Sequence, residues 1–536
     1  MRVDSKSIKK ITDRRHPLYK ELLPHWNFLG ESYNGGRSWF DKNIFRYMKE
    51  GDMEFGDRVK RAYRFNHTRE VVDLVNKYLF RAPIIRKKEG VPAELVAFWE
   101  RVNASNLSID EFMRLVSLKS SVYGRPWVVI DNRITGAVTM NDDGEEVPQE
   151  GVDLYAYIVP PQQVCDYAVD EAGQLLWVLL EENYRDDKDP YDSTGEVSLR
   201  YRLWTRQDWT LFSYKKTGRT NGTWFVHDAG VHGLDLVPVI PANNSVSADL
   251  WDCPALIADV AYLDRAVANY ASNLDAIIQD QTFSQLAMPA QNVLPGDDAY
   301  DKLLEMGTKR VFLYDGEGGQ APAYLSPDPR QATLIISAIQ QLINEIYHSV
   351  GLAGERTKQD NAKGIDNSSG VAKSKDFERV VALLSSKADA LETVENQIVK
   401  IVCAWAEVDV PTEDVVVYPV ESQFDVRTLY DEIDVAMKLR LMSVPATVMS
   451  EQMMRVVEKL FPDLGEDVLK KMKNDLVSWA TDLQESAEQE RQESSDGSKK
   501  VIEEAKRNRD QAASKRSETL SRANGKSSDQ AKGQEK

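Results

Sequence analysis

The chain has 536 residues, of which 67 are basic and 85 are acidic, so its formal net charge is −18. A chain of this length is too long for one hydrophobic core and predicts two or more domains. The acidic surplus excludes a general electrostatic attraction of the whole chain to nucleic acid or anionic lipid, so any DNA contact has to be local or weak.

The three cysteines, Cys165, Cys253 and Cys403, lie far apart and show no C-x-x-C spacing. This pattern argues against a disulfide framework or a zinc site and fits a reducing compartment. We therefore expect ordinary thiols in the core. No apolar run is long enough to cross a bilayer, and none follows the basic N-terminus as a secretion signal requires.

The first part of the chain predicts helices at 69–80, 92–102 and 108–121, the last opening with the capping-box pattern S-I-D-E. The hydrophobic period changes at Tyr123-Gly124-Arg125-Pro126. Short β-branched and aromatic runs separated by turn clusters then predict a meandering antiparallel sheet. The runs are 127–131, 155–159, 175–181, 198–204, 209–215 and 223–227, with a closing segment at 237–241.

Two long helices, 252–278 and 331–350, bracket a segment rich in proline and glycine. In the first helix Asp252 is a plausible N-cap with Pro254 in the first turn, and apolar residues recur at alternating steps of four and three. An ordinary antiparallel pair in a bundle core would show the same pattern. The segment between them carries a strand signal at 311–314 and a short predicted helix at 297–306. The apolar stripe of the first helix is Leu256, Val260, Leu263, Val267, Tyr270, Leu274 and Ile277.

A polar loop that begins at Gly351 follows the second helix. Its glycines permit positive φ, and Arg356, Lys358 and Lys363 can approach phosphates without reading bases. An ordinary surface loop with incidental charge is the alternative. Beyond it the sequence predicts a third long helix at 371–407, a strand at 415–420 and helices at 426–442, 450–460 and 465–483. After Gln484 the polar composition predicts either disorder or a solvated single helix.

Motifs for catalysis are missing from the sequence. The phosphate-cradling pattern G-x-x-x-x-G-K-[ST] and the nucleophile-elbow pattern G-x-S-x-G do not occur. His227 and His232 form a near pair with no carboxylate or cysteine at ligand spacing, which disfavours a metal site. We therefore expect no enzymatic activity, no cofactor and no metal.

The order of these elements resembles the portal proteins of tailed double-stranded DNA bacteriophages over roughly residues 33–483. The segments that carry the resemblance are NHTREVVDLVNKYLFRAPI, SVYGRPWVVID, YAYIVPPQQVCDY, HDAGVHGLDLVPVIP and TLIISAIQQLINEIYHSVGL. The resemblance implies an α+β, mainly helical fold with long stem helices, an antiparallel β wing region, a small α/β clip and a helical crown. It divides the chain into the wing (1–250), first stem helix (251–281), clip (282–329), second stem helix (330–350), tunnel loop (351–370), long wing helix and strand (371–425), crown (426–483) and polar tail (484–536).

The resemblance further implies a ring of about twelve subunits at one capsid vertex. Double-stranded DNA would pass through its channel during packaging and ejection, and terminase, a head-tail adaptor, capsid and scaffolding proteins would be its partners. The location would be the virion, with assembly in the host cytoplasm and no membrane contact. The implied site residues are Arg356, Lys358 and Lys363 for DNA contact, Asp259, Asp264 and Asp275 as channel-lining acids, and Leu256, Val260, Leu263, Val267 and Leu274 for subunit packing.

Two other functions remain open on sequence grounds. One is a different structural protein of a capsid or tail, and the other is an enzyme whose site is assembled from scattered acids. The order of helix, excursion and helix favours the portal over the other structural protein, and the missing nucleotide and nucleophile motifs count against the enzyme.

Overall fold

The computed structural model of the protein divides into two compact units, Met1–Phe424 and Asp425–Lys536, each of which is described by itself. The described residues are 5–48, 50–81, 83–87, 90–103, 105–134, 137–140, 146–149, 152–187, 189–216, 222–247, 252–282, 285–289, 311–314, 323–325, 329–352, 370–411, 413–418, 429–442, 444–460 and 466–528.

Local sequence signals set both ends of α7 (Ile109–Tyr123) in the first unit. The Ser108 side chain accepts a hydrogen bond from the Glu111 backbone, and the Glu111 carboxylate accepts one from the Ser108 backbone at 2.9 Å, which is the expected capping box. Gly124 follows the last turn with φ 81°, and a Cβ there would lie 1.8 Å from the Cys253 carbonyl oxygen, so only glycine fits. The helices before the main strands are α1 (Ser5–Thr12), α2 (Pro17–Asn34), α3 (Arg37–Asn43), α4 (Asp52–Arg61), α5 (His67–Leu79), α6 (Ala93–Glu100) and α7 (Ile109–Tyr123).

The strands form two main sheets, so the expectation of a single meander is wrong. A five-stranded antiparallel meander has the order β10-β9-β8-β7-β6, and a separate antiparallel sheet has the order β11-β2-β5. The strands are β2 (Trp127–Ile134), β5 (Val152–Val159), β6 (Val164–Val169), β7 (Leu175–Arg185), β8 (Val197–Thr205), β9 (Asp208–Lys216), β10 (Gly222–Val231) and β11 (Val239–Pro241).

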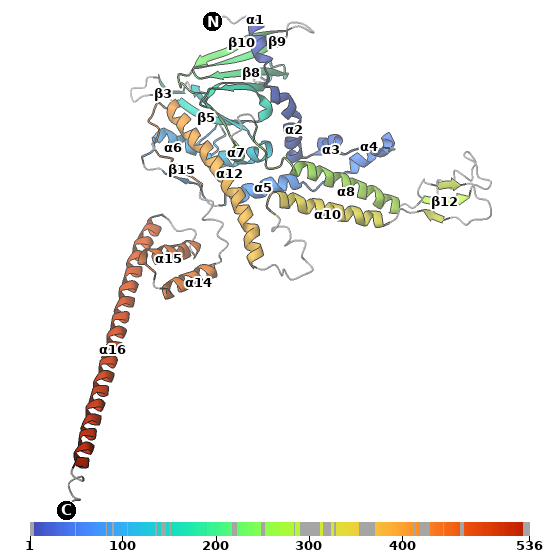
Figure 1. Ribbon diagram of the computed structural model, residues 1–536. Helices are drawn as coiled ribbons and strands as arrows, with labels where there is room; N and C mark the ends of the chain where they lie inside the picture. The colour runs from blue at the N-terminus through green and yellow to red at the C-terminus, as the bar shows by residue number, and fades with distance from the viewer. Residues whose placement is uncertain are drawn as a thin grey trace, which may run out of the picture. The chain divides into compact units, whose positions relative to one another are not determined.

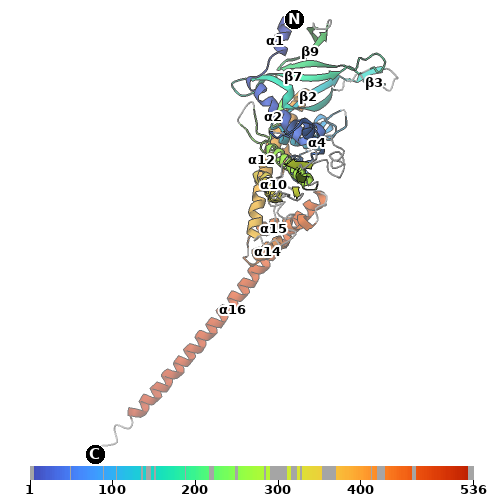
Figure 2. The same cartoon turned by 90° about the vertical axis from the view of Figure 1, so that its right-hand side faces the viewer.

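The separation of the sheets follows from the burial of β2 on both faces. Val128 and Ile130 pack into the main core of the first unit, whereas Val129, on the opposite face, packs with Trp204 in a second apolar cluster. A strand that is buried on both faces has a continuous run of apolar residues in the sequence. Such a run does not indicate which strands pair with it. The five-stranded sheet is covered elsewhere by α1, whose Ile8 packs among its side chains (Figure 2).

The third long helix, α12 (Gly370–Trp405), passes through the main core, as Figure 1 shows, and confirms the helix expected at 371–407. Leu384, Leu391, Ile398 and Val402 are fully buried along it. Beside it β1 (Ile85–Arg86) pairs with β15 (Val416–Val417), which is shorter than the strand expected at 415–420. A further hairpin joins β3 (Ala137–Met140) to β4 (Glu146–Gln149).

Two buried charged side chains fix α12 to its neighbours. Lys387 donates hydrogen bonds to Ser120 Oγ at 3.0 Å and to Asn244 Oδ1 at 2.8 Å, so it joins α7 to the segment that follows β11. Glu395 accepts hydrogen bonds from Arg86 Nε at 2.6 Å and from the Tyr418 hydroxyl at 2.7 Å. Burial raises the pKa of Glu395, against the opposing effect of the Arg86 guanidinium.

The second unit is helical. It contains α14 (Leu429–Leu441), α15 (Ala446–Leu460) and α16 (Glu466–Ser528), of which α15 packs against α16. The segment after Gln484 is part of α16, so the alternative of a solvated single helix is the one observed, and its described side chains from Lys499 to Thr519 are exposed.

Helices and predominantly antiparallel sheets in separate stretches of the chain make this an α+β fold, as expected. All three cysteines are free and buried, which confirms their assignment as core thiols. None of the described helices has the length and apolarity needed to cross a membrane.

Lys387 should make the stability of the first unit depend on pH. Burial lowers the pKa of its ammonium group to about 7, so between that value and its ordinary pKa of about 10.4 the unfolded chain binds more protons than the folded chain. The free energy of unfolding of the wild type should therefore rise relative to that of Lys387→Met by about 1.4 kcal/mol per pH unit above pH 7.

Urea unfolding at several pH values up to about 9 measures this difference. Lys400→Met is the matched control, because Lys400 is exposed on the same helix and should follow the wild type at every pH. A difference between wild type and Lys387→Met that stays constant with pH would show that Lys387 keeps an ordinary pKa.

Candidate functional site

A helical hairpin with a small sheet at its end is the candidate functional site of the first unit. The helices α8 (Val260–Thr282) and α10 (Pro329–Ser349) pack side by side, and the sheet lies beyond their far ends (Figure 1). The first helix begins later than the expected 252–278, and the second matches the expected 331–350. The sheet has the order β13-β12-β14, with β12 (Gln285–Pro289) parallel to β13 (Val311–Tyr314) and antiparallel to β14 (Ala323–Leu325).

The near end of the hairpin is embedded in the main core. Val260 and Val267 of α8 and Ile346 of α10 belong to the same buried apolar cluster as the long helix α12. This burial explains the apolar stripe seen in the sequence at the base of the helix. The helices therefore pack within the subunit over this part of their length.

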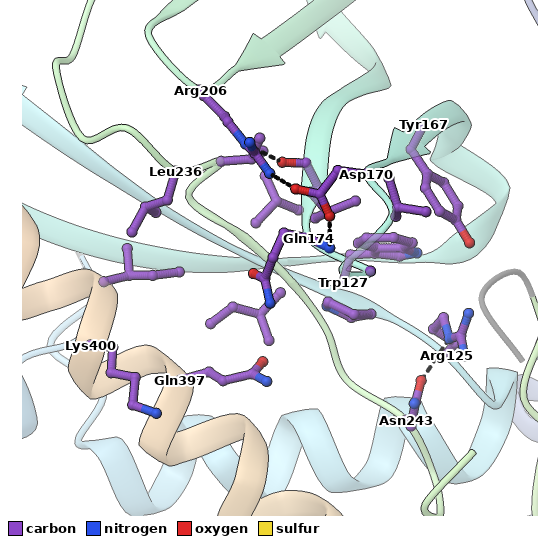
Figure 3. Close-up of a pocket in the computed structure, with 18 of the residues that line it drawn as sticks. Arg125, Trp127, Tyr167, Asp170, Gln174, Arg206, Leu236, Asn243, Gln397 and Lys400 are labelled. Carbon is purple, nitrogen blue, oxygen red and sulfur yellow. Dashed lines mark hydrogen bonds and ion pairs between the residues drawn. The ribbon is translucent and has the colours of Figure 1, made fainter. Parts of the chain in front are cut away.

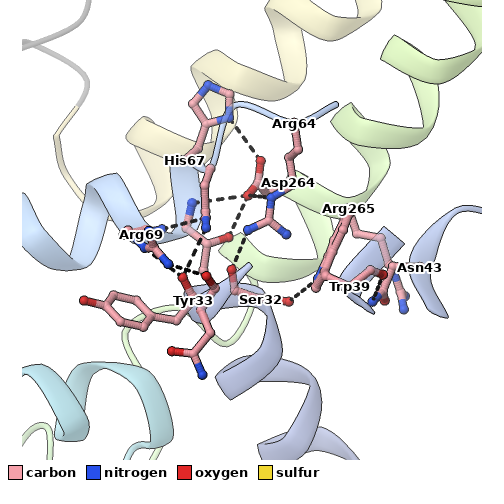
Figure 4. Close-up of polar contacts among 12 residues, drawn as sticks. Ser32, Tyr33, Trp39, Asn43, Arg64, His67, Arg69, Asp264 and Arg265 are labelled. Atoms are coloured by element: carbon pink, nitrogen blue, oxygen red, sulfur yellow. Dashed lines mark hydrogen bonds and ion pairs between the residues drawn. The ribbon is translucent and has the colours of Figure 1, made fainter. Parts of the chain in front are cut away.

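A buried carboxylate fixes α8 to the N-terminal helices (Figure 4). Asp264 is fully buried, and its Oδ2 accepts hydrogen bonds from the hydroxyl of Thr68 at 2.8 Å and from its backbone N–H at 3.3 Å. Its Oδ1 lies 3.0 Å from His67 Nδ1, and the Arg64 Nε lies 3.5 Å from Oδ2. The ion pair and the hydrogen bonds together offset the cost of removing the carboxylate from water.

The guanidinium of Arg64 extends this network to α2 and α3. It lies 4.0 Å above the centre of the Trp39 ring, and it donates a hydrogen bond to the Ser32 carbonyl oxygen. Burial lowers the pKa of Arg64, and the Asp264 carboxylate opposes that shift. The Trp39 indole in turn donates to Ser32 Oγ at 3.2 Å, so one arginine holds three helices in place.

A second buried ion pair lies further along α8. Arg58 of α4 donates two hydrogen bonds to the Glu50 carboxylate, both at 2.7 Å, and a third to Ser272 Oγ of α8 at 3.0 Å. The paired hydrogen bonds raise the pKa of Arg58 and lower that of Glu50. Beyond it, Arg61 lies 3.7 Å from Asp275.

These contacts define a second stripe on α8 that the sequence analysis missed. Asp264, Ala268, Ser272 and Asp275 recur at steps of four, four and three, so they share one face of the helix. Ala268 is buried against Trp39, Ile44 and Val59. The signal for this face was a helical spacing of small and polar residues, which a search for apolar residues alone does not detect.

The far part of the hairpin exposes large apolar side chains. Leu334 is 72% exposed, and Ile336 on the same helix and Ile278 at the end of α8 are also exposed. The segment packed against α8 adds to this surface, with Met48 99% exposed and Phe45 and Phe65 more than half exposed. Single exposed apolar residues are common, but a concentration of them on one structural feature indicates a binding surface. We call these six residues the apolar hairpin surface.

The structure corrects several site assignments made from the sequence. Asp264 is buried in the network described above, so it does not line a channel. Asp259 is exposed, and Asp275 is half-buried beside Arg61. Val260 and Val267 are buried in the subunit's own core, so they are not available for subunit packing, and Leu256, Leu263 and Leu274 are partly buried. The loop cations Arg356, Lys358 and Lys363, and the helix expected at 297–306, lie outside the described residues.

A pocket of about 680 Å³ lies elsewhere in the first unit, between the two sheets and α12 (Figure 3). Its polar wall is internally paired, because Arg206 donates to Asp170 at 2.6 Å and Arg125 donates to Asn243 at 2.6 Å. The Arg206 contact lowers the pKa of Asp170. We assign this pocket no ligand. Among the described residues, no group of three or more histidine, cysteine, aspartate or glutamate side chains is placed to hold a metal ion.

Replacement of Asp264 by alanine should destabilise the first unit by about 3 to 5 kcal/mol, because Arg64 would remain buried without a counter-charge. Thermal and urea unfolding measure the loss. Asp259→Asn is the matched control, since Asp259 is exposed just before the same helix and asparagine can cap a helix as aspartate does, so stability should change by less than about 0.5 kcal/mol. Equal stabilities of the two variants would contradict the role given to Asp264.

No protein-family model and no curated protein sequence matches the chain. Among solved structures, a chain from the neck of an empty GTA particle, computed with C6 symmetry, is 12% identical, with a TM-score of 0.35 over 76% of this chain and 94% of that chain. A chain from the virion of a native gene transfer agent (GTA) particle is also 12% identical, with a TM-score of 0.34 over 78% of this chain and 99% of that chain. TM-scores this low do not establish a common fold.

Proposed function

We propose that this chain is the subunit of a portal ring of a phage-type particle, a structural protein through whose central channel double-stranded DNA passes. The observation that carries the proposal is the hairpin of α8 and α10, whose base is fixed in the subunit core. Its far part and the N-terminal segment packed against α8 together expose the apolar hairpin surface. A rigid element with an apolar surface is suited to contact another copy of the chain.

A closed ring forms if one face of each subunit contacts a different face of the next subunit. Such a heterologous contact repeats around an axis and leaves no face unpaired when the rotation closes. The apolar hairpin surface supports this arrangement, because it includes residues from α10, such as Leu334, and residues from the N-terminal segment packed on α8, such as Met48. The neighbouring copy would cover side chains that the isolated subunit leaves in water, which stabilises the ring by about 25 cal/mol per Å² of apolar area removed from water.

In this proposal the hairpin helices are the stem, 282–329 is the clip, and 351–370 is the tunnel loop. The clip would dock terminase during packaging and the head-tail adaptor later, and capsid and scaffolding proteins would contact the outside of the ring. The residues of 1–250 and 371–425 would form the wing, and 426–483 the crown. The location would be a capsid vertex of the virion.

The acidic surplus of the chain supports a conduit in which DNA moves. Every phosphate that pairs with a protein cation releases a counterion and strengthens adhesion, so a channel with a strongly basic wall would retain the duplex. A net charge of −18 repeated in every subunit opposes such adhesion. Of the acids first assigned to the channel, Asp259 is the exposed one that this proposal keeps.

Substitution of Leu334 by glutamate should release monomers from the ring, because it places a charge in the proposed contact between subunits. The stability of the isolated subunit should change little, since the Leu334 side chain is largely exposed there. Native mass spectrometry measures the assembly state, and far-UV circular dichroism should be unchanged. Tyr191→Glu is the matched control, since Tyr191 is 97% exposed outside the hairpin and its substitution should leave the ring intact. Rings of unchanged mass in the Leu334 variant would contradict the proposed contact.

Removal of the tunnel-loop cations should impair DNA handling without impairing assembly. Alanine at Arg356, Lys358 and Lys363 should lower genome retention in assembled heads, because these are the cations proposed to contact passing phosphates. The three cations are not part of the proposed contact between subunits, so ring mass should not change. Alanine at Lys6, Lys9 and Lys10, three exposed cations of α1, is the control and should package normally. Normal retention in the loop variant would make this loop only a connector.

A further inference from the structure

The second half of α16 has a charge opposite to that of the rest of the chain. Residues 499–528 contain nine basic and four acidic residues, a local net charge of +5 in a chain whose total is −18. The stretch before it, 484–498, contains five acidic residues and one basic residue. The basic residues are Lys499, Lys500, Lys506, Arg507, Arg509, Lys515, Arg516, Arg522 and Lys526.

Four of the nine basic residues share one side of the helix, and the other five lie on the side that also carries the acids. At about 100° per residue, Lys499, Lys506, Arg509 and Arg516 fall within one sector of about 100°, which holds none of the four acids. The acids Glu503, Glu504, Asp510 and Glu518 fall within a sector of about 120° on another side. The described side chains of 499–519, which include these four cations, are exposed.

The chemistry of this surface selects among possible partners. A membrane-surface helix needs a continuous apolar face, but the exposed Val501 and Ile502 are the only large apolar residues before Leu520. Single-stranded nucleic acid is bound largely by stacking on aromatic side chains, and 499–528 contains none. A protein interface usually needs buried aromatic or apolar anchors, which are equally scarce here. A run of basic side chains without apolar or aromatic anchor residues is suited to bind a polyanion whose charges are regularly spaced.

We propose that residues 499–528 form a basic arm that binds the phosphates of double-stranded DNA without sequence preference. The arm spans about 45 Å at 1.5 Å per residue, which matches about 13 base pairs of duplex. Lysine and arginine reach phosphates along this length, and phosphate contacts carry no sequence information. This inference goes beyond the portal ring, because it assigns a DNA contact to the second unit that needs neither the stem nor the tunnel loop.

The test is fluorescence anisotropy of a labelled duplex of about 25 base pairs with the purified full-length protein over a range of salt concentrations. Glutamine at Lys499, Lys506, Arg509 and Arg516 should weaken binding by roughly tenfold or more at low salt and reduce the slope of log affinity against log salt by up to about 3.6, at 0.9 per lost phosphate contact. Two duplexes of unrelated sequence should give the same affinities.

The matched control carries glutamine at Glu503, Glu504, Asp510 and Glu518, which removes the same number of charges of opposite sign from the same helix. It should bind the duplex more tightly than the wild type. Equal weakening in both variants would attribute the effect to the helix itself and overturn the proposal. The proposal also fails if the wild type does not bind the duplex, if the basic variant binds it unchanged, or if vesicles of anionic lipid are bound more tightly than DNA.

The outcome separates this inference from the proposed ring. A basic-arm variant that forms normal rings but binds duplex weakly supports DNA binding by the arm. A Leu334→Glu monomer that still binds duplex also supports DNA binding by the arm, and its duplex binding is no test of the ring. If alanine at Arg356, Lys358 and Lys363 abolishes duplex binding while the basic-arm variant keeps it, the DNA contact belongs to the loop and the arm has no such role.

Discussion

The structure of the first unit depends on the neutralisation of a carboxylate buried on α8. An isolated charge in an apolar interior is costly, so Asp264 is stable there only because Arg64, His67 and Thr68 surround it. Those partners come from the segment that leads into and begins α5, whereas Asp264 lies about two hundred residues later in the chain. The network therefore joins distant segments and fixes the direction in which the hairpin leaves the core.

The same constraint accounts for the two ends of the hairpin. At its base, α8 has apolar residues on one face and a polar face satisfied by Asp264 and Ser272, so both faces are used within the subunit. Further out, side chains such as Leu334 and Ile278 have no comparable cover in the subunit. A hairpin held rigidly at one end and apolar at the other can transmit a contact with a neighbouring copy to the subunit core.

Local sequence signals predicted α5, α6, α7, α10 and α12 closely, because the determinants of a helix lie within a few residues of one another. The capping box at Ser108 and the long apolar pattern of α12 are examples. The same signals gave no bounds for α1 to α4, and α8 begins eight residues later than expected. The sheet arrangement could not be predicted in the same way, since pairing of β2 with β11 joins segments about a hundred residues apart and a fully apolar strand does not specify its neighbours. Asp264 was misassigned for a related reason: an acidic residue off the apolar stripe is normally solvated, and only the tertiary partners reveal that it is buried.

The central claim is that copies of this chain close into a ring around a channel for duplex DNA. Electron microscopy of the purified full-length protein tests it most directly, with native mass spectrometry to give the subunit number. We predict closed rings with a central opening wide enough for duplex DNA. The mass of the ring should correspond to about twelve subunits. A protein that remains monomeric at micromolar concentration, or that forms sheets or tubes without a central channel, would contradict the account.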